Sequence, residues 1–252
     1  MKVVKLKELI IGEGKPKIAV PIVGKTIEEI HQEAEKLRNL PCDIIEWRLD
    51  LFDEVDNYEA VIDISHQLTA LLPDTPLLLT FRTLHEGGAR AFDSDSYYEL
   101  YRAVIEKGCL DMLDLELFMA DGPGAQIIKE AQGKGISIIM SNHDFDQTPD
   151  QDEIVKRLRM MVEREADICK MAVMPQTPED VLTLLQATNK MKQQTDRPIV
   201  TMSMGQLGLV SRIFGEIFGS AITFGAAEQS SAPGQLPTRQ LAELLETVSW
   251  HG

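Results

Sequence analysis

The sequence predicts a single (β/α)8 TIM barrel over residues 1–252, with eight parallel strands that alternate with helices. Three observations support this fold class. Eight short β-rich runs alternate with stretches of helical periodicity, the connections between them are short, and no Pro-, Gly- or Ser-rich linker divides the chain. A chain of 252 residues with 44% apolar content can also bury one large core.

The predicted strands are short apolar runs. They cover residues 17–23, 42–49, 76–82, 110–117, 136–143, 167–173, 198–204 and 220–225. Such runs fit a parallel sheet, because both of its faces are buried. Ahead of the first strand, residues 3–16 are predicted to form a β-hairpin that covers the N-terminal mouth of the barrel, with Gly12 to Gly14 as its turn.

Helices are predicted between the strands from their start and stop signals. One start signal is the capping box, in which Thr or Ser stands three residues before Glu and the two side chains bind free backbone N–H groups. The other is a Thr-Pro pair, with the proline at the first helical position. The capping boxes are Thr26 with Glu29 and Ser96 with Glu99, and the Thr-Pro pairs are Thr148-Pro149 and Thr177-Pro178. The glycines expected to end helices are Gly108, Gly135 and Gly219.

Charge and cysteine content exclude several classes of protein. Lys and Arg number 25 against 40 Asp and Glu, and the formal charge of −15 opposes binding to nucleic acid or to an anionic membrane surface. Any anionic ligand must therefore be held by a local group of Arg or Lys. The cysteines, Cys42, Cys109 and Cys169, lie far apart and outside any CxxC spacing, which argues against a disulfide framework and a zinc site.

The same observations indicate the cell compartment. Three unpaired cysteines fit a reducing cytosol. No apolar run approaches the roughly 20 residues of a membrane helix, and the N-terminal sequence lacks the apolar core of a signal peptide. We therefore expect a cytoplasmic protein without membrane association.

The strand period places charged side chains inside the barrel. Successive side chains of a strand point to opposite faces, so Glu46 and Arg48 share one face while Ile45 and Trp47 share the other. The charged face must be the interior one, because the outer face packs against helices. By the same parity the interior positions include Ile44, Thr80, Arg82, Asp114, Glu116, Ser141, His143, Ile168, Lys170, Ala172, Met202 and Met204. The charges cluster near the carboxyl ends of the strands, where barrel enzymes build their active sites.

Each charged residue also has an interpretation without chemistry. Lys170 could extend toward water along an apolar surface, and Glu46 with Arg48 could form a structural ion pair. Asp114 and Glu116 could ligate a metal, yet no further acidic or His residue accompanies them at ligand spacing, so we expect no metal site.

Burial would give Lys170 a chemical use. A lysine with the ordinary pKa of about 10.4 is protonated and a poor nucleophile, whereas desolvation and a nearby cation favour the neutral amine that attacks a ketone. The resulting Schiff base is an electron sink that acidifies the neighbouring carbon. This chemistry needs a proton carrier, for which His143 has a suitable intrinsic pKa.

Several motifs resemble those of a known family, the type I 3-dehydroquinate dehydratases of the shikimate pathway. The run DLEL at 114–117 is followed, after residues 118–137, by IIMSNHD at 138–144, which fits the family signature. Further matches occur in the expected order at EWRLD (46–50), TFRTxxEGG (80–88), CKMAVMP (169–175), MSMG (202–205), GLVSRIFG (208–215) and SAPGQ (231–235). The resemblance therefore covers nearly the whole chain.

The resemblance implies a catalytic barrel that removes water from 3-dehydroquinate to give 3-dehydroshikimate. It implies no metal or organic cofactor, and commonly a homodimer. Lys170 resembles the Schiff-base lysine, His143 the general acid/base, and Glu86 the acid that orients His143. Arg212 resembles the residue that grips the substrate carboxylate in a fork geometry. The positions similar to those that bind substrate hydroxyls and carboxylate are Glu46, Arg48, Arg82, Ser231 and Gln235, of which the last two belong to a loop expected to close as a lid.

Some features depart from this pattern or leave alternatives. Pro21 stands where some family members carry a hydroxyl residue, so we expect one peripheral substrate contact to be absent, and His85 has no assigned role.

A class I aldolase also uses a barrel lysine, but it needs a phosphate site that GQLGLVSR (205–212) fits only loosely. A non-catalytic binding protein would not need both Lys170 and His143, and a structural protein would have no reason to bury so many charges.

Overall fold

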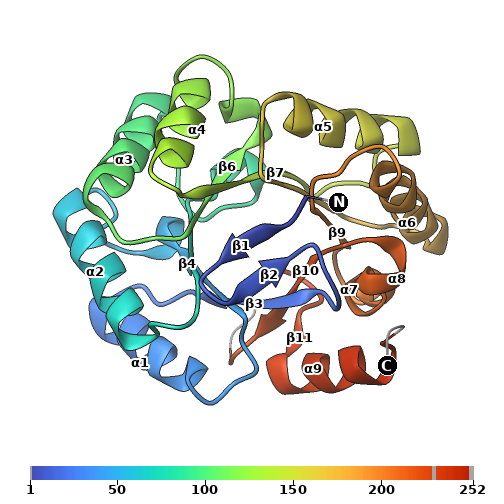
Figure 1. Cartoon of the computed structure of the whole chain (residues 1–252), viewed down its shortest axis with the longest axis horizontal. Coiled ribbons are helices and arrows are strands. Elements are labelled where there is room, and N and C mark those ends of the chain that lie inside the picture. The colour runs from blue at the N-terminus through green and yellow to red at the C-terminus, as the bar shows by residue number, and fades with distance from the viewer. Residues whose placement is uncertain (1, 229–230, 250–252) are drawn as a thin grey trace.

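The computed structural model describes residues 2–228 and 231–249 and shows a parallel barrel inside a ring of helices (Figure 1). Within these residues the barrel strands are β3 (Lys17–Ile22), β4 (Ile44–Arg48), β5 (Leu77–Thr80), β6 (Met112–Glu116), β7 (Ser137–Asp144), β8 (Ile168–Val173), β9 (Ile199–Ser203) and β10 (Ile222–Ala226). Strands β3 to β9 pair in chain order, and β10 pairs with β3. A bridge between Ile199 and Ser220 links the β9 and β10 ends, and β11 (Leu236–Pro237) extends β10. The predicted (β/α)8 barrel is confirmed.

The helices surround the strands, as Figure 1 shows. The α-helices are α1 (Ile27–Leu37), α2 (Tyr58–Leu71), α3 (Ser94–Lys107), α4 (Pro123–Gly133), α5 (Gln151–Glu163), α6 (Pro178–Lys192), α7 (Leu209–Ile213), α8 (Gly215–Phe218) and α9 (Thr238–Thr247). Three 3-10 turns follow strands at the carboxyl end of the barrel or the loop beyond it: η1 (Leu49–Leu51), η2 (Leu84–Glu86) and η3 (Leu117–Met119).

Two of the four predicted helix starts are wrong, and an aspartate explains both. Thr26 and Thr177 cap α1 and α6 as predicted. Helix α3, however, begins at Ser94 with Asp93 as its cap, and Ser96 donates its backbone N–H to that carboxylate. The cap of α5 is Asp150, and the Thr148 hydroxyl instead donates to the Met174 carbonyl at 3.1 Å. An ionised carboxylate at the positive end of a helix is at least as good a cap as a hydroxyl.

The expected helix ends are confirmed. Gly108 and Gly219 are the residues at which α3 and α8 end, and Gly135 follows the end of α4. Gly219 has a φ of +108°, a conformation that favours glycine.

The N-terminal hairpin covers the barrel mouth as predicted, but its turn lies elsewhere. Strands β1 (Val4–Leu6) and β2 (Leu9–Ile11) pair antiparallel and cross the middle of the ring in Figure 1. Leu6 and Ile11 pack on interior side chains from the start of the barrel strands. Leu6 pairs directly with Leu9, so the turn is the two-residue Lys7-Glu8, with Lys7 at a φ of +53°. Gly12 and Gly14, also with positive φ, lead from the hairpin into β3.

Two apolar clusters confirm the predicted alternation along the strands. The outer cluster, between strands and helices, includes Ile45, Trp47 and Leu49. The inner cluster contains Ile44 and Ile168 from the opposite faces of their strands, together with other interior residues, among them Ala172, Met202 and Met204. The floor of the barrel is therefore filled by apolar side chains, and the interior charged groups lie toward its carboxyl-end mouth.

Candidate active site

A small cavity at the carboxyl ends of the strands gathers most of the predicted site residues. Its volume is about 40 Å³. The predicted residues that line it are Glu46, Arg48, Arg82, Glu86, His143, Lys170, Ser231 and Gln235. Apolar side chains complete the wall, namely those of Phe145, Ala172, Met202, Met204, Ala232 and Phe224. Charged groups from β4, β7, β8 and the loop after β5 thus converge on one cavity, and the segment after β10 adds the polar Ser231 and Gln235.

Lys170 lies on β8 with only 4% of its surface exposed. Its Nζ is 3.5 Å from Asp114 Oδ2 and 3.8 Å from Glu46 Oε1, and it lies 4.6 Å above the centre of the Phe224 ring. Lys170 therefore does not extend to water. Its ion-pair partners are two carboxylates, Glu46 and Asp114.

Arg82 is held by three carboxylates, two from β6 and one from η2. Its guanidinium donates to Glu116 Oε1 at 2.9 Å and to Asp114 Oδ1 at 2.8 Å, and it lies 3.5 Å from Glu86 Oε2. Burial alone would lower the pKa of Arg82, but these carboxylates raise it above its ordinary value. Asp114 and Glu116 are thus partners of Arg82, and the charge of Arg82 permits three acidic groups to approach one another.

His143 and Glu86 form a hydrogen-bonded pair. His143 Nδ1 is 2.9 Å from Glu86 Oε2, and the same oxygen accepts the His143 backbone N–H at 2.9 Å. Asn142 Nδ2 donates to the other oxygen of Glu86 at 2.9 Å. With Nδ1 engaged, Nε2 is the ring nitrogen left for a ligand. The pair is therefore held from both sides before any ligand binds.

Burial shifts the pKa values of this pair in opposite directions. Burial, together with the positive charges of Arg82, Lys170 and Arg48, lowers the pKa of His143 well below 6.5. Burial and the nearby Glu116 carboxylate raise the pKa of Glu86 to about 8. The imidazole is therefore neutral at neutral pH, the form in which it can accept a proton from a ligand.

The loop that contains Glu86 depends on a glycine. Gly87 has a φ of +81°, and a Cβ on this residue would lie 2.3 Å from the Phe145 ring. The Phe145 ring in turn stacks on the His143 imidazole with centroids 6.3 Å apart. A glycine is thus required for Phe145 to pack between this loop and the imidazole.

Arg212 on α7 is a buried cation without a carboxylate partner among the described residues. It is 1% exposed, its Nε has no hydrogen-bond acceptor, and its Nη1 lies 3.7 Å from Met202 Sδ. Its Nη2 donates to the Pro233 carbonyl at 3.0 Å. Burial lowers the pKa of Arg212 to about 10. Arg212 does not line the cavity itself but lies beside two segments that do.

The loop at 231–235 lies over the cavity. Ser231 donates its backbone N–H to Gln235 Oε1 at 2.9 Å, and Gln235 Nε2 donates to Ser231 Oγ at 3.0 Å. The Pro233 carbonyl accepts from the Gly205 N–H at 3.1 Å. A Cβ on Gly234, whose φ is +79°, would lie 2.2 Å from the Gly205 carbonyl oxygen. The glycine permits this close approach, which brings Ser231 and Gln235 to the cavity.

Arg48 pairs with Asp50 rather than with Glu46, so the alternative of a Glu46–Arg48 ion pair is wrong. Asp50 receives two hydrogen bonds from the Arg48 guanidinium, at 2.8 and 2.7 Å. It also accepts the backbone N–H groups of Arg82 and Ala89. Arg48 ends β4 and Asp50 lies two positions later in η1. Their side chains meet because η1 turns the chain back toward the strand end.

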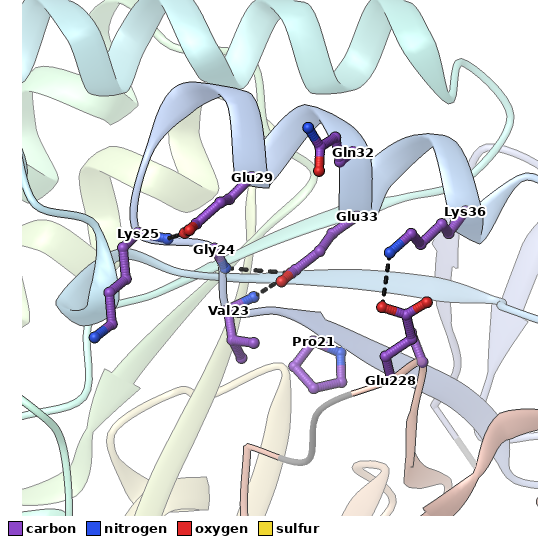
Figure 2. Close-up of a pocket in the computed structure, with 10 residues that line it drawn as sticks. Pro21, Val23, Gly24, Lys25, Glu29, Gln32, Glu33, Lys36 and Glu228 are labelled. Atoms are coloured by element: carbon purple, nitrogen blue, oxygen red, sulfur yellow. Dashed lines mark hydrogen bonds and ion pairs between the residues drawn. The ribbon is translucent and has the colours of Figure 1, made fainter.

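Pro21 faces a neighbouring pocket rather than the central cavity. That pocket, of about 440 Å³, lies between the end of β3, helix α1 and residues 227–228 (Figure 2). Glu33 accepts the backbone N–H groups of Val23 and Gly24, which fixes the chain after β3. Lys36 donates to Glu228 at 2.7 Å, which ties α1 to the segment that leads toward residues 231–235.

Sequence reasoning missed the residues that hold the site together. Asp50 lies in the EWRLD motif and Asp114 in the DLEL motif, and strand parity placed Asp114 inside the barrel. Neither received a role, because a partner such as Arg82 comes from a distant strand. His85, on η2, lines an outer groove with Phe118 and does not reach the central cavity.

The described residues contain no cluster of three His, Cys, Asp or Glu side chains placed to hold a metal ion. None of the helices described in residues 2–228 and 231–249 is long and apolar enough to cross a membrane.

The fold and the cavity together define a class of protein, a (β/α)8-barrel enzyme with its site at the carboxyl ends of the strands. The sequence profile of the type I 3-dehydroquinase family matches residues 18–250. The chain belongs to this family, whose members are hydro-lyases.

Individual relatives agree with this assignment. The chain is 53% identical to a 3-dehydroquinate dehydratase of Enterococcus faecalis over 98% of both chains. It is 48% identical to one of Clostridioides difficile, over 97% of this chain and 96% of the relative. Solved structures of 3-dehydroquinate dehydratases from Enterococcus faecalis and Clostridium difficile superpose with TM-scores of 0.92 and 0.95, at 49% and 47% identity. The first covers 97% of this chain and 98% of the relative, and the second, which contains covalently modified comenic acid, covers 98% of each. Family membership sets aside the aldolase, binding-protein and structural-protein alternatives.

Proposed function

We propose that this enzyme eliminates water from 3-dehydroquinate to give 3-dehydroshikimate through a Schiff base on Lys170. The observation that carries the proposal is that Lys170 and His143 line one cavity, with His143 held by Glu86. A lysine amine and a proton carrier in one site are what imine chemistry requires. The covalently modified comenic acid in the Clostridium difficile relative supports a covalent mechanism in the family.

The proposed sequence begins with attack of the Lys170 amine on the substrate ketone. The addition product loses water with a proton supplied through His143, and a protonated imine forms. His143 then removes a proton from the carbon next to the imine and delivers one to the departing hydroxyl. Water finally hydrolyses the imine and restores the amine. The low pKa of His143 supports its role as a base, because the imidazole is neutral before the proton transfer.

Glu86 and Arg212 have supporting roles in this proposal. Glu86 bonds His143 Nδ1, which orients the ring and leaves Nε2 for the substrate. Arg212 is a buried guanidinium without a carboxylate partner among the described residues, and the substrate carboxylate would supply one. Glu46, Arg48, Arg82, Ser231 and Gln235 would bind substrate hydroxyls and carboxylate, and residues 231–235 would enclose the substrate.

Three further properties belong to the same proposal. Residues 1–252 act as one catalytic domain, since the barrel strands and the cavity span the chain. The enzyme works as a homodimer and in the cytoplasm, as the resemblance to the family and the cysteine usage imply.

Turnover of 3-dehydroquinate tests the proposal. The product is a conjugated enone and the substrate an isolated ketone, so the reaction is followed by the rise in ultraviolet absorbance. Lys170→Ala should abolish turnover and still bind the substrate. Lys156→Ala, which removes an exposed lysine on α5, is the matched control and should keep wild-type activity. Full activity in Lys170→Ala would overturn the proposal.

A further inference from the structure

Asp114 is the most deeply buried acidic group beside Lys170. The residue is 0% exposed and lies on β6, the strand across β7 from that of Lys170. Its Oδ1 accepts two hydrogen bonds, from Arg82 Nη2 at 2.8 Å and from Ser141 Oγ at 2.6 Å. These bonds fix the plane of the carboxylate, so the direction of its second oxygen is set by the barrel wall.

The second oxygen, Oδ2, has no hydrogen-bond partner among the described residues and lies 3.5 Å from Lys170 Nζ. A buried carboxylate oxygen without a donor is costly unless a charge faces it. Burial by itself would raise the pKa of Asp114, but Arg82 and Lys170 lower it below its ordinary value. The carboxylate is therefore ionised, and its free oxygen faces the proposed reacting amine.

We infer that Asp114 is the counter-ion of the protonated imine formed on Lys170, an inference that rests on the proposed function. Attack of the amine on the ketone and loss of water convert Nζ into an iminium nitrogen with one N–H and a positive charge. That charge cannot move away as a free ammonium could, because Nζ is now bonded to the substrate. Asp114 Oδ2, already aimed at Nζ, accepts the N–H and balances the charge between two buried side chains.

The neighbouring groups favour Asp114 over Glu46 for this role. Glu46 Oε1 is farther from Nζ, at 3.8 Å, and already accepts the Thr80 hydroxyl at 3.1 Å. Glu46 also lines the cavity, where a substrate hydroxyl can contact it, whereas Asp114 does not line the cavity. Asp114 therefore keeps one oxygen, Oδ2, for Lys170 Nζ, while its Oδ1 binds Arg82 and Ser141.

Asp114→Asn tests the inference, because it removes the charge and keeps the shape. The imine is trapped by borohydride reduction in the presence of 3-dehydroquinate and quantified by mass spectrometry. We expect the rate of trapping and kcat to fall by about 10- to 100-fold, the range for losing a hydrogen bond to a charged group. Ser141→Ala, which removes a donor to Oδ1 but keeps the charge, is the control and should trap the imine much faster than Asp114→Asn.

A binding measurement separates this role from a structural one. In a Lys170→Ala background no imine can form, so calorimetry with 3-dehydroquinate reports the non-covalent complex alone. Adding Asp114→Asn to Lys170→Ala should change the Kd by less than about threefold. A loss of binding as large as the loss of kcat would mean that Asp114 only holds Arg82 in place, and wild-type trapping by Asp114→Asn would also overturn the inference.

Two further outcomes remain informative. If wild type formed no adduct, the proposed function itself would fail, which is distinct from a failure confined to Asp114. If Asp114→Asn did not fold, Glu46→Gln would still test the inference. The inference predicts that Glu46→Gln weakens substrate binding in the Lys170→Ala background. Slow trapping by Glu46→Gln with undiminished binding would assign the counter-ion to Glu46 and contradict the inference.

Discussion

Replacing Arg212 by methionine should stabilise the unliganded enzyme and destroy its affinity for substrate. Burial lowers the pKa of Arg212 from 12.5 to about 10. At about 1.4 kcal/mol per pKa unit, the buried charge costs about 3 kcal/mol of folding free energy. The folded-state pKa is below the unfolded one, so this cost is present in full below pH 10 and disappears only as the pH rises toward 12.5.

The substitution also removes favourable contacts. The hydrogen bond from Nη2 to the Pro233 carbonyl contributes about 1 kcal/mol, and a flexible, apolar methionine can fill the space beside Met202. The net expectation is a gain of about 2 kcal/mol, which in a chain of this size raises Tm by about 4–8 °C. Any gain should be accompanied by loss of 3-dehydroquinate binding, because no other buried guanidinium in the described residues lacks a carboxylate partner.

Thermal unfolding at pH 7, without substrate, measures the first effect, and calorimetry with 3-dehydroquinate measures the second. Arg159→Met, on the exposed face of α5 where the guanidinium donates to Gln194, is the control and should leave Tm nearly unchanged. A lower Tm for Arg212→Met would refute the view that Arg212 is an uncompensated charge. Unaltered substrate affinity would assign the carboxylate to another cation.

Three other predictions concern the remaining charged groups. The His143 ring signals in NMR spectra should not titrate between pH 8 and about 6, because the pKa of His143 lies well below 6.5. The neutral, buried imidazole contributes stability that is lost as the pH falls below the pKa of histidine in the unfolded chain. A titration midpoint of these signals near pH 6.5 would contradict the burial argument. Glu86 has a raised pKa of about 8, so the native state holds a proton that the unfolded chain lacks between pH 4.5 and 8, and the free energy of unfolding should fall as the pH rises through this window. Urea unfolding of Glu86→Gln should show a weaker fall than wild type, and an identical pH dependence would exclude Glu86 as its source. Asp50→Asn leaves the largely buried Arg48 charge without its partner and should lower the free energy of unfolding, measured in urea, by about 3–5 kcal/mol. A decrease below about 1 kcal/mol would show that the Arg48–Asp50 pair is screened by water.

Local patterns predicted most of the fold, because the patterns follow from geometry that is nearly independent of tertiary contacts. The two-residue period of a strand placed Lys170 and Glu46 inside the barrel and Trp47 outside it. The errors arose where two local signals compete within a few residues. Asp93 displaced the Ser96 capping box, and a two-residue turn at Lys7 preceded the glycines expected to turn the hairpin.

The residues that make up the site could be predicted from the sequence, but the ion pairs between them could not. Parity and motif resemblance identified the residues that line the cavity, since each of those signals is carried by a short stretch of sequence. The partner of a buried charge depends on the register between strands, which no single stretch contains. Arg82, just after β5, thus meets Asp114 from β6, and Arg48 turns to Asp50 rather than to Glu46 on its own strand.

The central claim is that Lys170 forms a covalent bond to the substrate. The most direct test is the mass of the protein after borohydride reduction in the presence of 3-dehydroquinate, followed by peptide mapping. We predict a stable adduct on the peptide that contains Lys170 and none in Lys170→Ala. The absence of an adduct in the wild-type protein, or an adduct on a different lysine, would contradict the proposed mechanism.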